Sequence, residues 1–237
     1  MSIYVGAWVR WSPDGRAFVT QGTDAKGRRG IYRIDAETGE AAPIAIERGE
    51  QDAGAFVFPC WSPDGKRVFY TRYLRRKGQP DDVSLIERDL VSGTDRVVIS
   101  RPRADFDLKQ WALSPDGRYA AGVGRNPSTG KIEAILIPIA GAEPRYVGGS
   151  FFMWAPDSRS VFVRRSESGL WRISVDRTDS EHIAWKPDPV GQQAERGIGI
   201  VRPSPDGRHV AVMVTTRPKP EELWSLENFL PTFTADK

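Results

Sequence analysis

The sequence predicts an all-β protein built from a repeated sheet unit, and three observations support this prediction. A five-residue turn motif, first present at residues 11–15, returns four more times with intervals of 50, 52, 41 and 49 residues between its prolines. Each copy is followed by a short apolar run rich in β-branched and aromatic residues. No window of 11 or more residues shows the 3.6-residue apolar period of an amphipathic helix, so we expect almost no helix.

The motif reads Ser-Pro-Asp-Gly in most copies and predicts a tight turn between two strands. Proline fixes φ for a type I turn, Ser and Asp side chains bond the local backbone, and glycine takes the left-handed position that follows. The fourth copy has Ser158 where the others have glycine, so Ser158 is expected at positive φ. The copies occupy residues 11–15, 61–65, 113–117, 154–158 and 203–207.

Two further strands follow each turn in most repeats, which gives a four-stranded antiparallel unit. Third strands are expected at residues 31–34, 85–88, 134–137, 170–173 and 223–226. Fourth strands are expected near residues 43–46, 96–99, 144–147 and 182–185. Sheets that repeat with this spacing predict an all-β β-propeller, one domain over residues 1–237, with five blades. The blades are expected near residues 6–46, 54–99, 108–147, 150–185 and 198–228.

The fifth repeat lacks a fourth strand in the sequence, whereas residues 2–5 form a strand-like segment with no unit of its own. We therefore expect residues 2–5, with Ile3–Val5 at their centre, to be the outer strand of the last blade. Such a pairing would close the ring and remove exposed strand edges.

Composition restricts the functional classes. The net charge of +3, with a pI near 9.1, is too balanced to indicate nucleic-acid binding. The single cysteine, Cys60, can form neither an internal disulfide nor a cysteine metal site. No segment approaches 18 apolar residues and no signal peptide is evident, so no membrane span is expected. The chain as given is expected in the cytoplasm, or in the periplasm as a fragment of a longer exported protein.

The turns, the strands that follow them and the Thr-Gly or Ser-Gly turns after the third strands resemble the TolB-like, WD-repeat-like β-propellers. The resemblance covers essentially the whole chain. Residues 222–231 are also similar to the C-terminal end of long bacterial propeller proteins, which implies that the chain could belong to a longer multidomain protein. The family resemblance implies a binding platform for proteins or peptides, because most members act in that way.

No catalytic signature is present: a Gly-x-Ser-x-Gly turn, a glycine-rich phosphate loop and a kinase catalytic loop are all missing from the sequence. We therefore predict no catalytic residue, no metal site and no cofactor. The predicted inner strands, which would line a central channel, contain no Asp or Glu, and a glycosidase would have to use carboxylates at the channel mouth. The candidates there are Glu50, Asp52, Asp105, Asp107 and Glu195.

The inner strands do contain cationic residues, namely Arg10, Lys109 and Arg202. They would suit a small anion site in the channel, because guanidinium groups pair well with carboxylate and phosphate. The alternative is that the arginines bond turn carboxylates such as Asp14 or Asp206 and only strengthen their blades.

Charge is distributed unequally between the two predicted faces. The face formed by the loops between blades and between second and third strands carries more basic than acidic residues, and the opposite face has the reverse. The candidate binding residues on the more basic face are Arg72, Arg75, Arg76, Arg101, Arg103 and Arg125. We therefore predict a non-catalytic platform for an acidic protein or peptide, rather than for nucleic acid. The alternatives are an ordinary solvated surface, or an anionic small-molecule binder or hydrolase that uses the channel.

Overall fold

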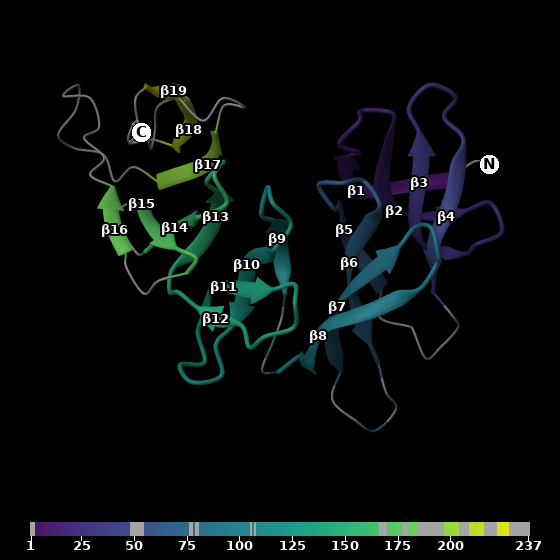
Figure 1. Ribbon diagram of the computed structural model, residues 1–237, viewed down its shortest axis with the longest axis horizontal. Helices are drawn as coiled ribbons and strands as arrows, with labels where there is room; N and C mark the ends of the chain where they lie inside the picture. The colour runs from purple at the N-terminus through teal and green to yellow at the C-terminus, as the bar shows by residue number, and fades with distance from the viewer. Residues whose placement is uncertain are drawn as a thin grey trace, which may run out of the picture. The chain divides into compact units, whose positions relative to one another are not determined.

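The computed structural model describes residues 3–47, 55–75, 78, 81–104, 106, 108–165, 170–176, 180–183, 197–203, 209–215 and 222–227. The strands of these residues form five antiparallel sheets, and each sheet is built from strands consecutive in the sequence (Figure 1). No helix occurs within the described ranges. The predicted all-β fold of antiparallel four-stranded units is confirmed, while the number of blades in a complete ring and its closure stay predictions.

The sheets follow the predicted repeats closely. The first contains β1 (Ile3–Trp11), β2 (Ala17–Asp24), β3 (Arg29–Asp35) and β4 (Ala41–Ile46). The second contains β5 (Ala55–Trp61), β6 (Arg67–Leu74), β7 (Asp82–Asp89) and β8 (Asp95–Pro102). The third contains β9 (Lys109–Leu113), β10 (Tyr119–Arg125), β11 (Ile132–Pro138) and β12 (Arg145–Tyr146).

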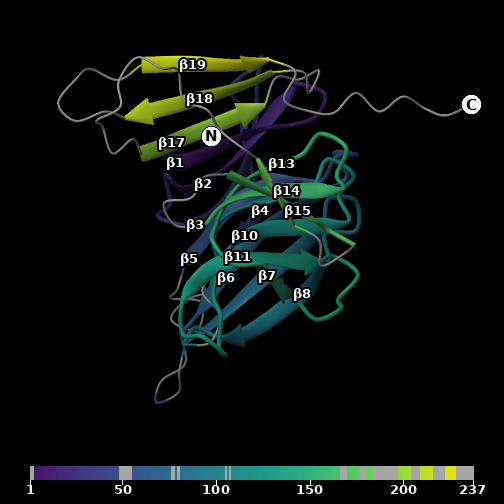
Figure 2. The same ribbon diagram turned by 90° about the vertical axis from the view of Figure 1, so that its left-hand side faces the viewer.

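The fourth sheet contains β13 (Ser150–Trp154), β14 (Ser160–Arg164), β15 (Leu170–Ser174) and β16 (Ser180–Ile183). The fifth contains β17 (Gly197–Pro203), β18 (His209–Thr215) and β19 (Glu222–Glu227), which lie side by side in Figure 2. Within the described residues this last sheet has three strands. This agrees with the sequence, in which the fifth repeat has no fourth strand.

The chain divides into two compact units, residues 1–146 and 147–237. The boundary falls between the third and fourth sheets, so each unit consists of whole sheets. The prediction of a single domain over residues 1–237 stays a prediction.

The turns at the ends of β1, β5 and β9 have the predicted internal bonding. In the first turn the Ser12 hydroxyl donates to Asp14 (2.6 Å) and accepts from the Ala17 amide (3.0 Å), while the Arg16 amide donates to Asp14 (3.1 Å). The hydrogen bond from Ser12 and that from the Arg16 amide hold the pKa of Asp14 below its ordinary value. Gly15 has φ of 70°, as the motif predicts.

The N-terminal segment is placed differently from the prediction. Ile3, Tyr4 and Val5 belong to β1 and pair with Asp24, Thr23 and Gly22 of β2, so their predicted role as the outer strand of the last blade is wrong. The physical reason is that β2 is long enough to pair with the whole of β1. The β1–β2 pairing has a register shift between Val5 and Val9 and continues beyond it to Ile3.

The three sheets of the first unit pack through apolar side chains and tryptophan hydrogen bonds. One buried cluster joins the first and second sheets and another joins the second and third. Trp61 Nε1 donates to the Arg10 carbonyl (3.1 Å), and Trp111 Nε1 donates to Thr71 Oγ1 (2.9 Å). These two tryptophans therefore mediate packing between neighbouring sheets of the first unit.

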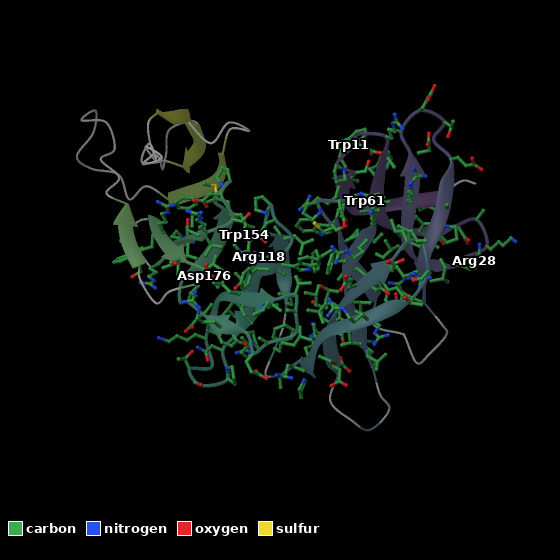
Figure 3. All side chains as sticks on the ribbon, in the orientation of Figure 1. Trp11, Arg28, Trp61, Arg118, Trp154 and Asp176 are labelled. Atoms are coloured by element: carbon green, nitrogen blue, oxygen red, sulfur yellow. The ribbon has the colours of Figure 1, made fainter. Side chains whose placement is uncertain are left out.

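Trp11 occupies the same place in the first turn motif as Trp61 does in the second (Figure 3). Its side chain is 62% exposed and contacts Phe18 edge to face at 5.6 Å. The difference arises because no sheet of the first unit precedes the first one in the chain.

Candidate binding site at the loop end of the first two sheets

The first two sheets enclose a pocket of about 240 Å³. It lies at the end of these sheets where β1 and β3 begin, β2 ends and β5 starts, which we call the loop end. The Ser-Pro-Asp-Gly turns lie at the opposite end of the same strands, the turn end. The apolar wall of the pocket is formed by Tyr4, Phe56 and Val57. The pocket is therefore on the side that the sequence predicts as the binding face.

Glycines shape the pocket by admitting neighbouring groups that a side chain would displace. A Cβ atom at Gly6 would overlap the Gln21 side chain, and one at Gly30 would overlap the Ala45 carbonyl. Gly22, between Gln21 and Thr23, also lines the pocket. Gln21 carries a buried Oε1 that accepts no hydrogen bond, which leaves an unsatisfied acceptor in a pocket residue.

Glu47 fixes the boundary between the two sheets at the pocket. Its Oε1 accepts the Phe56 amide (3.2 Å), and its Oε2 lies 3.7 Å from Arg29 Nε. Both of these partners line the pocket, as Glu47 itself does. The carboxylate therefore ties the end of the first sheet to the start of β5 and neutralises Arg29 at the rim.

The loop between β2 and β3 follows Thr23, which lines the pocket, and it is held by the Asp24 carboxylate. The Asp24 carboxylate accepts hydrogen bonds from the Lys26 amide (2.9 Å), the Arg28 amide (2.9 Å) and Arg28 Nε (2.7 Å). Burial raises the pKa of Asp24, but the hydrogen bonds from Arg28 and Lys26 outweigh burial and leave the pKa below its ordinary value. Arg28 is labelled in Figure 3. The loop is thus fixed by an ionised carboxylate beside the pocket.

Arg72, one of the predicted binding residues, lies next to the pocket. It is the direct partner of Phe56 in the β5–β6 pairing, so the two side chains lie on the same face of the second sheet. Its Nε is buried and has no hydrogen-bond partner. A buried guanidinium nitrogen without a hydrogen-bond partner lowers the stability of the fold.

Arg75 and Arg103 meet at the same end of the second sheet. Both guanidiniums approach the Asp81 carboxylate, at 3.9 Å and 3.7 Å. Arg103 also lies over the Tyr73 ring, 5.1 Å from its centre. Two cations thus share one carboxylate, and we call Arg75 and Arg103 the arginine cluster.

The other predicted binding residues have different surroundings. Arg101 Nη2 donates to both carboxylate oxygens of Glu143 (2.8 and 3.0 Å), which links the second sheet to the third. Arg125 Nη1 donates to the Gly130 carbonyl (2.8 Å) within the β10–β11 hairpin. Arg76 lies outside the described residues.

The predicted anion site in the channel is not assembled by the described residues. Arg10 Nη1 donates to the Val9 carbonyl (3.2 Å), and its guanidinium lies over the Trp8 ring at 5.5 Å. It makes no bond to Asp14, so the alternative role of bracing that turn is not observed either. The side chains of Lys109 and Arg202 lie outside the described part of the structure. No group of three or more His, Cys, Asp or Glu residues suited to a metal occurs in the described ranges.

Sequence reasoning singled out Arg75 and Arg103, whose binding role stays a prediction, and it missed the pocket. Phe56 and Val57 read as ordinary strand residues, and Gln21 gives no pattern at all. The available signal was the close spacing of Gly6, Gly22 and Gly30, because glycines inside strands often mark a close approach of another group.

No protein-family model matches the chain, and no curated protein matches its sequence. Solved structures do match. TolB from Acinetobacter baumannii aligns with a TM-score of 0.57 at 15% identity, over 93% of this chain and 49% of its own. The fold is that of a TolB-like β-propeller.

Enzymes share this fold. An oligogalacturonate lyase from Vibrio parahaemolyticus aligns with a TM-score of 0.67 at 14% identity, over 92% of this chain and 60% of its own. Prolyl oligopeptidase B from Galerina marginata aligns with a TM-score of 0.64 at 14% identity, over 94% of this chain and 34% of its own. The chain therefore spans about half the length of TolB and 34% of the length of the peptidase. No helix of the described residues is long and apolar enough to cross a membrane.

Proposed function

We propose that this chain is a non-catalytic binding platform whose loop end takes an acidic segment of a partner protein or peptide. The observation that carries the proposal is the arginine cluster, in which the guanidiniums of Arg75 and Arg103 both approach the carboxylate of Asp81. Arginines that are held in place but incompletely neutralised suit carboxylates, because each guanidinium can bond two oxygens at once.

Rigidity supports the same proposal. Asp24 and Glu47 fix the loop and the strand ends on either side of the pocket, so a partner would meet a surface that needs little ordering. The solved structures with this fold include TolB proteins as well as enzymes.

A charge reversal tests this proposal. The double variant Arg75→Glu and Arg103→Glu should weaken capture of acidic partners from the native host by about tenfold at low salt, since two attractive charges become repulsive. Added salt should reduce capture by the unchanged protein, because the Debye length falls to about 8 Å at physiological ionic strength.

The matched control reverses two exposed cations at the turn end, Arg16→Glu and Lys66→Glu, and changes the net charge equally. Capture that falls only in the first variant supports the proposal. If both variants retain their partners and the salt dependence is unaltered, the loop end is not the binding surface.

A further inference from the structure

The boundary between the second and third sheets shows what occupies, one repeat later, the position of the pocket. The Tyr73 hydroxyl of β6 donates to the carbonyl of Leu108, directly before β9 (3.4 Å), so the phenol ring spans the space between these two sheets. The ring packs against the buried cluster that joins them. Arg103 lies over the ring, 5.1 Å from its centre. A phenol group with a guanidinium beside it therefore fills this space.

The corresponding positions of the preceding repeat line the pocket. Thr23 corresponds to Tyr73, because each lies five residues after the strand residue that pairs with the motif tryptophan. Phe56 corresponds to Leu108, because each lies five residues before the first residue of its turn motif. Both Thr23 and Phe56 are pocket residues. The first two sheets thus have a pocket where the next two have a tyrosine ring.

The size of the pocket agrees with one missing ring. Threonine in place of tyrosine leaves out the whole aromatic group, and the pocket encloses about 240 Å³. Sites for drug-sized ligands usually enclose roughly 300–1,000 Å³. An apolar cavity of about 150 Å³ holds one benzene molecule. The pocket is therefore suited to a single substituted ring.

The walls of the pocket resemble the surroundings of the Tyr73 ring. The Phe56 side chain is buried, and its ring is held against that of Tyr70 with the centres 5.1 Å apart, which gives a fixed apolar wall. Arg29 also lines the pocket, so a bound ring would have a guanidinium beside it. Glu47 lies 3.7 Å from Arg29 and balances its charge, which favours an uncharged ligand.

The backbone of Phe56 favours a hydroxyl on that ring. Its amide donates to Glu47 of the first sheet (3.2 Å). In a strand the carbonyl of a residue points to the same edge as its amide, so the Phe56 carbonyl is directed toward the first sheet. The corresponding carbonyl of Leu108 accepts the Tyr73 hydroxyl.

We infer that the pocket binds a free small molecule with an uncharged phenol ring, in the place that the Tyr73 ring takes between the next two sheets. This inference goes beyond the proposed function, because it requires neither an acidic partner nor the arginine cluster.

Amide chemical shifts recorded during a titration with p-cresol, the tyrosine side chain without its backbone, test the inference. Shifts are expected at Gly22, Thr23 and Phe56, with a Kd of about 1 mM because so small a ligand buries few atoms. None are expected at Tyr73 or Val83, where the equivalent space is filled. The saturated analogue 4-methylcyclohexanol should bind at least about fivefold more weakly, since it lacks the aromatic face.

A variant that fills the pocket provides the second test. Thr23→Tyr introduces the side chain that the next repeat has at this position, so it should abolish the p-cresol shifts. Val91→Tyr adds the same side chain at a position 88% exposed at the turn end, and it should leave p-cresol binding unchanged. The titration of the unaltered protein decides the matter even if Thr23→Tyr does not fold.

Several results would overturn the inference. They are the absence of shifts at about ten times the expected Kd, equal binding of p-cresol and its saturated analogue, and binding that persists in folded Thr23→Tyr. Tighter binding of the tripeptide Gly-Tyr-Gly than of p-cresol would assign the pocket to a protein segment instead of a free phenol.

Discussion

Ser158 shows how one residue departs from a repeated turn without changing its geometry. Its φ is 62°, close to the values of the glycines in the other described turns, and its side chain is only 4% exposed. The sequence predicted this conformation, because the turn needs a left-handed residue at that position whichever residue occupies it. A Cβ atom introduces steric strain in this left-handed conformation, which glycine avoids.

We expect Ser158→Gly to leave the free energy of unfolding unchanged or raise it by up to about 1 kcal/mol. Relief of the left-handed strain, about 1–2 kcal/mol, exceeds the greater flexibility of the unfolded chain, about 0.4–1 kcal/mol. Chemical denaturation measures the difference. Gly15→Ser is the reverse control, since a Cβ there meets open space, and it should be destabilising. Loss of stability in Ser158→Gly would contradict this account.

Phe58 is a residue that sequence reasoning could not place. It has φ of 55° inside the register shift between Val57 and Cys60, and its ring packs edge to face on Trp8 at 5.0 Å. Local preference disfavours an aromatic residue at positive φ. The conformation follows from packing between two sheets, which no local pattern in the sequence records.

At the scale of elements, the turns at β1, β5 and β9 depend on ionised aspartates. Hydrogen bonds from Ser62 and the Lys66 amide hold the pKa of Asp64 below 3.8. For Asp116, burial raises the pKa, but hydrogen bonds from Ser114 and Arg118 outweigh it. A carboxyl group whose pKa is lower in the folded than in the unfolded protein stabilises the fold at pH values above its unfolded pKa. This stabilisation is lost as the pH falls through the folded pKa.

The free energy of unfolding should therefore fall as the pH drops below about 4. Replacing Asp14, Asp64 and Asp116 together by asparagine should flatten this slope, because asparagine keeps an acceptor and cannot titrate. Denaturation series at several pH values measure the slope. An unchanged slope in the triple variant would show that these turns do not govern the acid response.

A buried charged group joins the second sheet to the third. Glu87 is buried and accepts hydrogen bonds from Arg67 Nη1 (2.8 Å) and Arg96 Nε (2.7 Å), and Arg96 also donates to the Ile139 carbonyl (3.0 Å). The hydrogen bond to Glu87 raises the pKa of Arg67. One carboxylate thus holds two guanidiniums at this boundary.

We expect Glu87→Gln to lower the free energy of unfolding by about 2–3 kcal/mol, below the 3–5 kcal/mol typical of fully buried pairs because both arginines are partly exposed. Glu143→Gln is the matched control. Its carboxylate pairs with Arg101 but is 84% exposed, so the change should cost less than about 1 kcal/mol. Equal losses from the two variants in urea denaturation would contradict the role of burial.

At the scale of the whole chain, the repeated turns determined most of what could be predicted. Their spacing placed five sheets correctly, because turn chemistry and strand patterns are local. The N-terminal strand was misplaced, since its partner depends on how far β2 extends rather than on its own residues. The pocket was missed for a similar reason: Tyr4, Gln21 and Phe56 come together only through pairing and packing.

The central claim is that an acidic segment binds at the loop end of the first two sheets. Amide chemical shifts recorded while a glutamate-rich peptide is added test this most directly. We predict changes at Gly22, Thr23, Phe56 and Arg72, with none at Gly15 and Gly65 of the turn end. Changes confined to the turn end, or spread evenly over both ends, would contradict the claim.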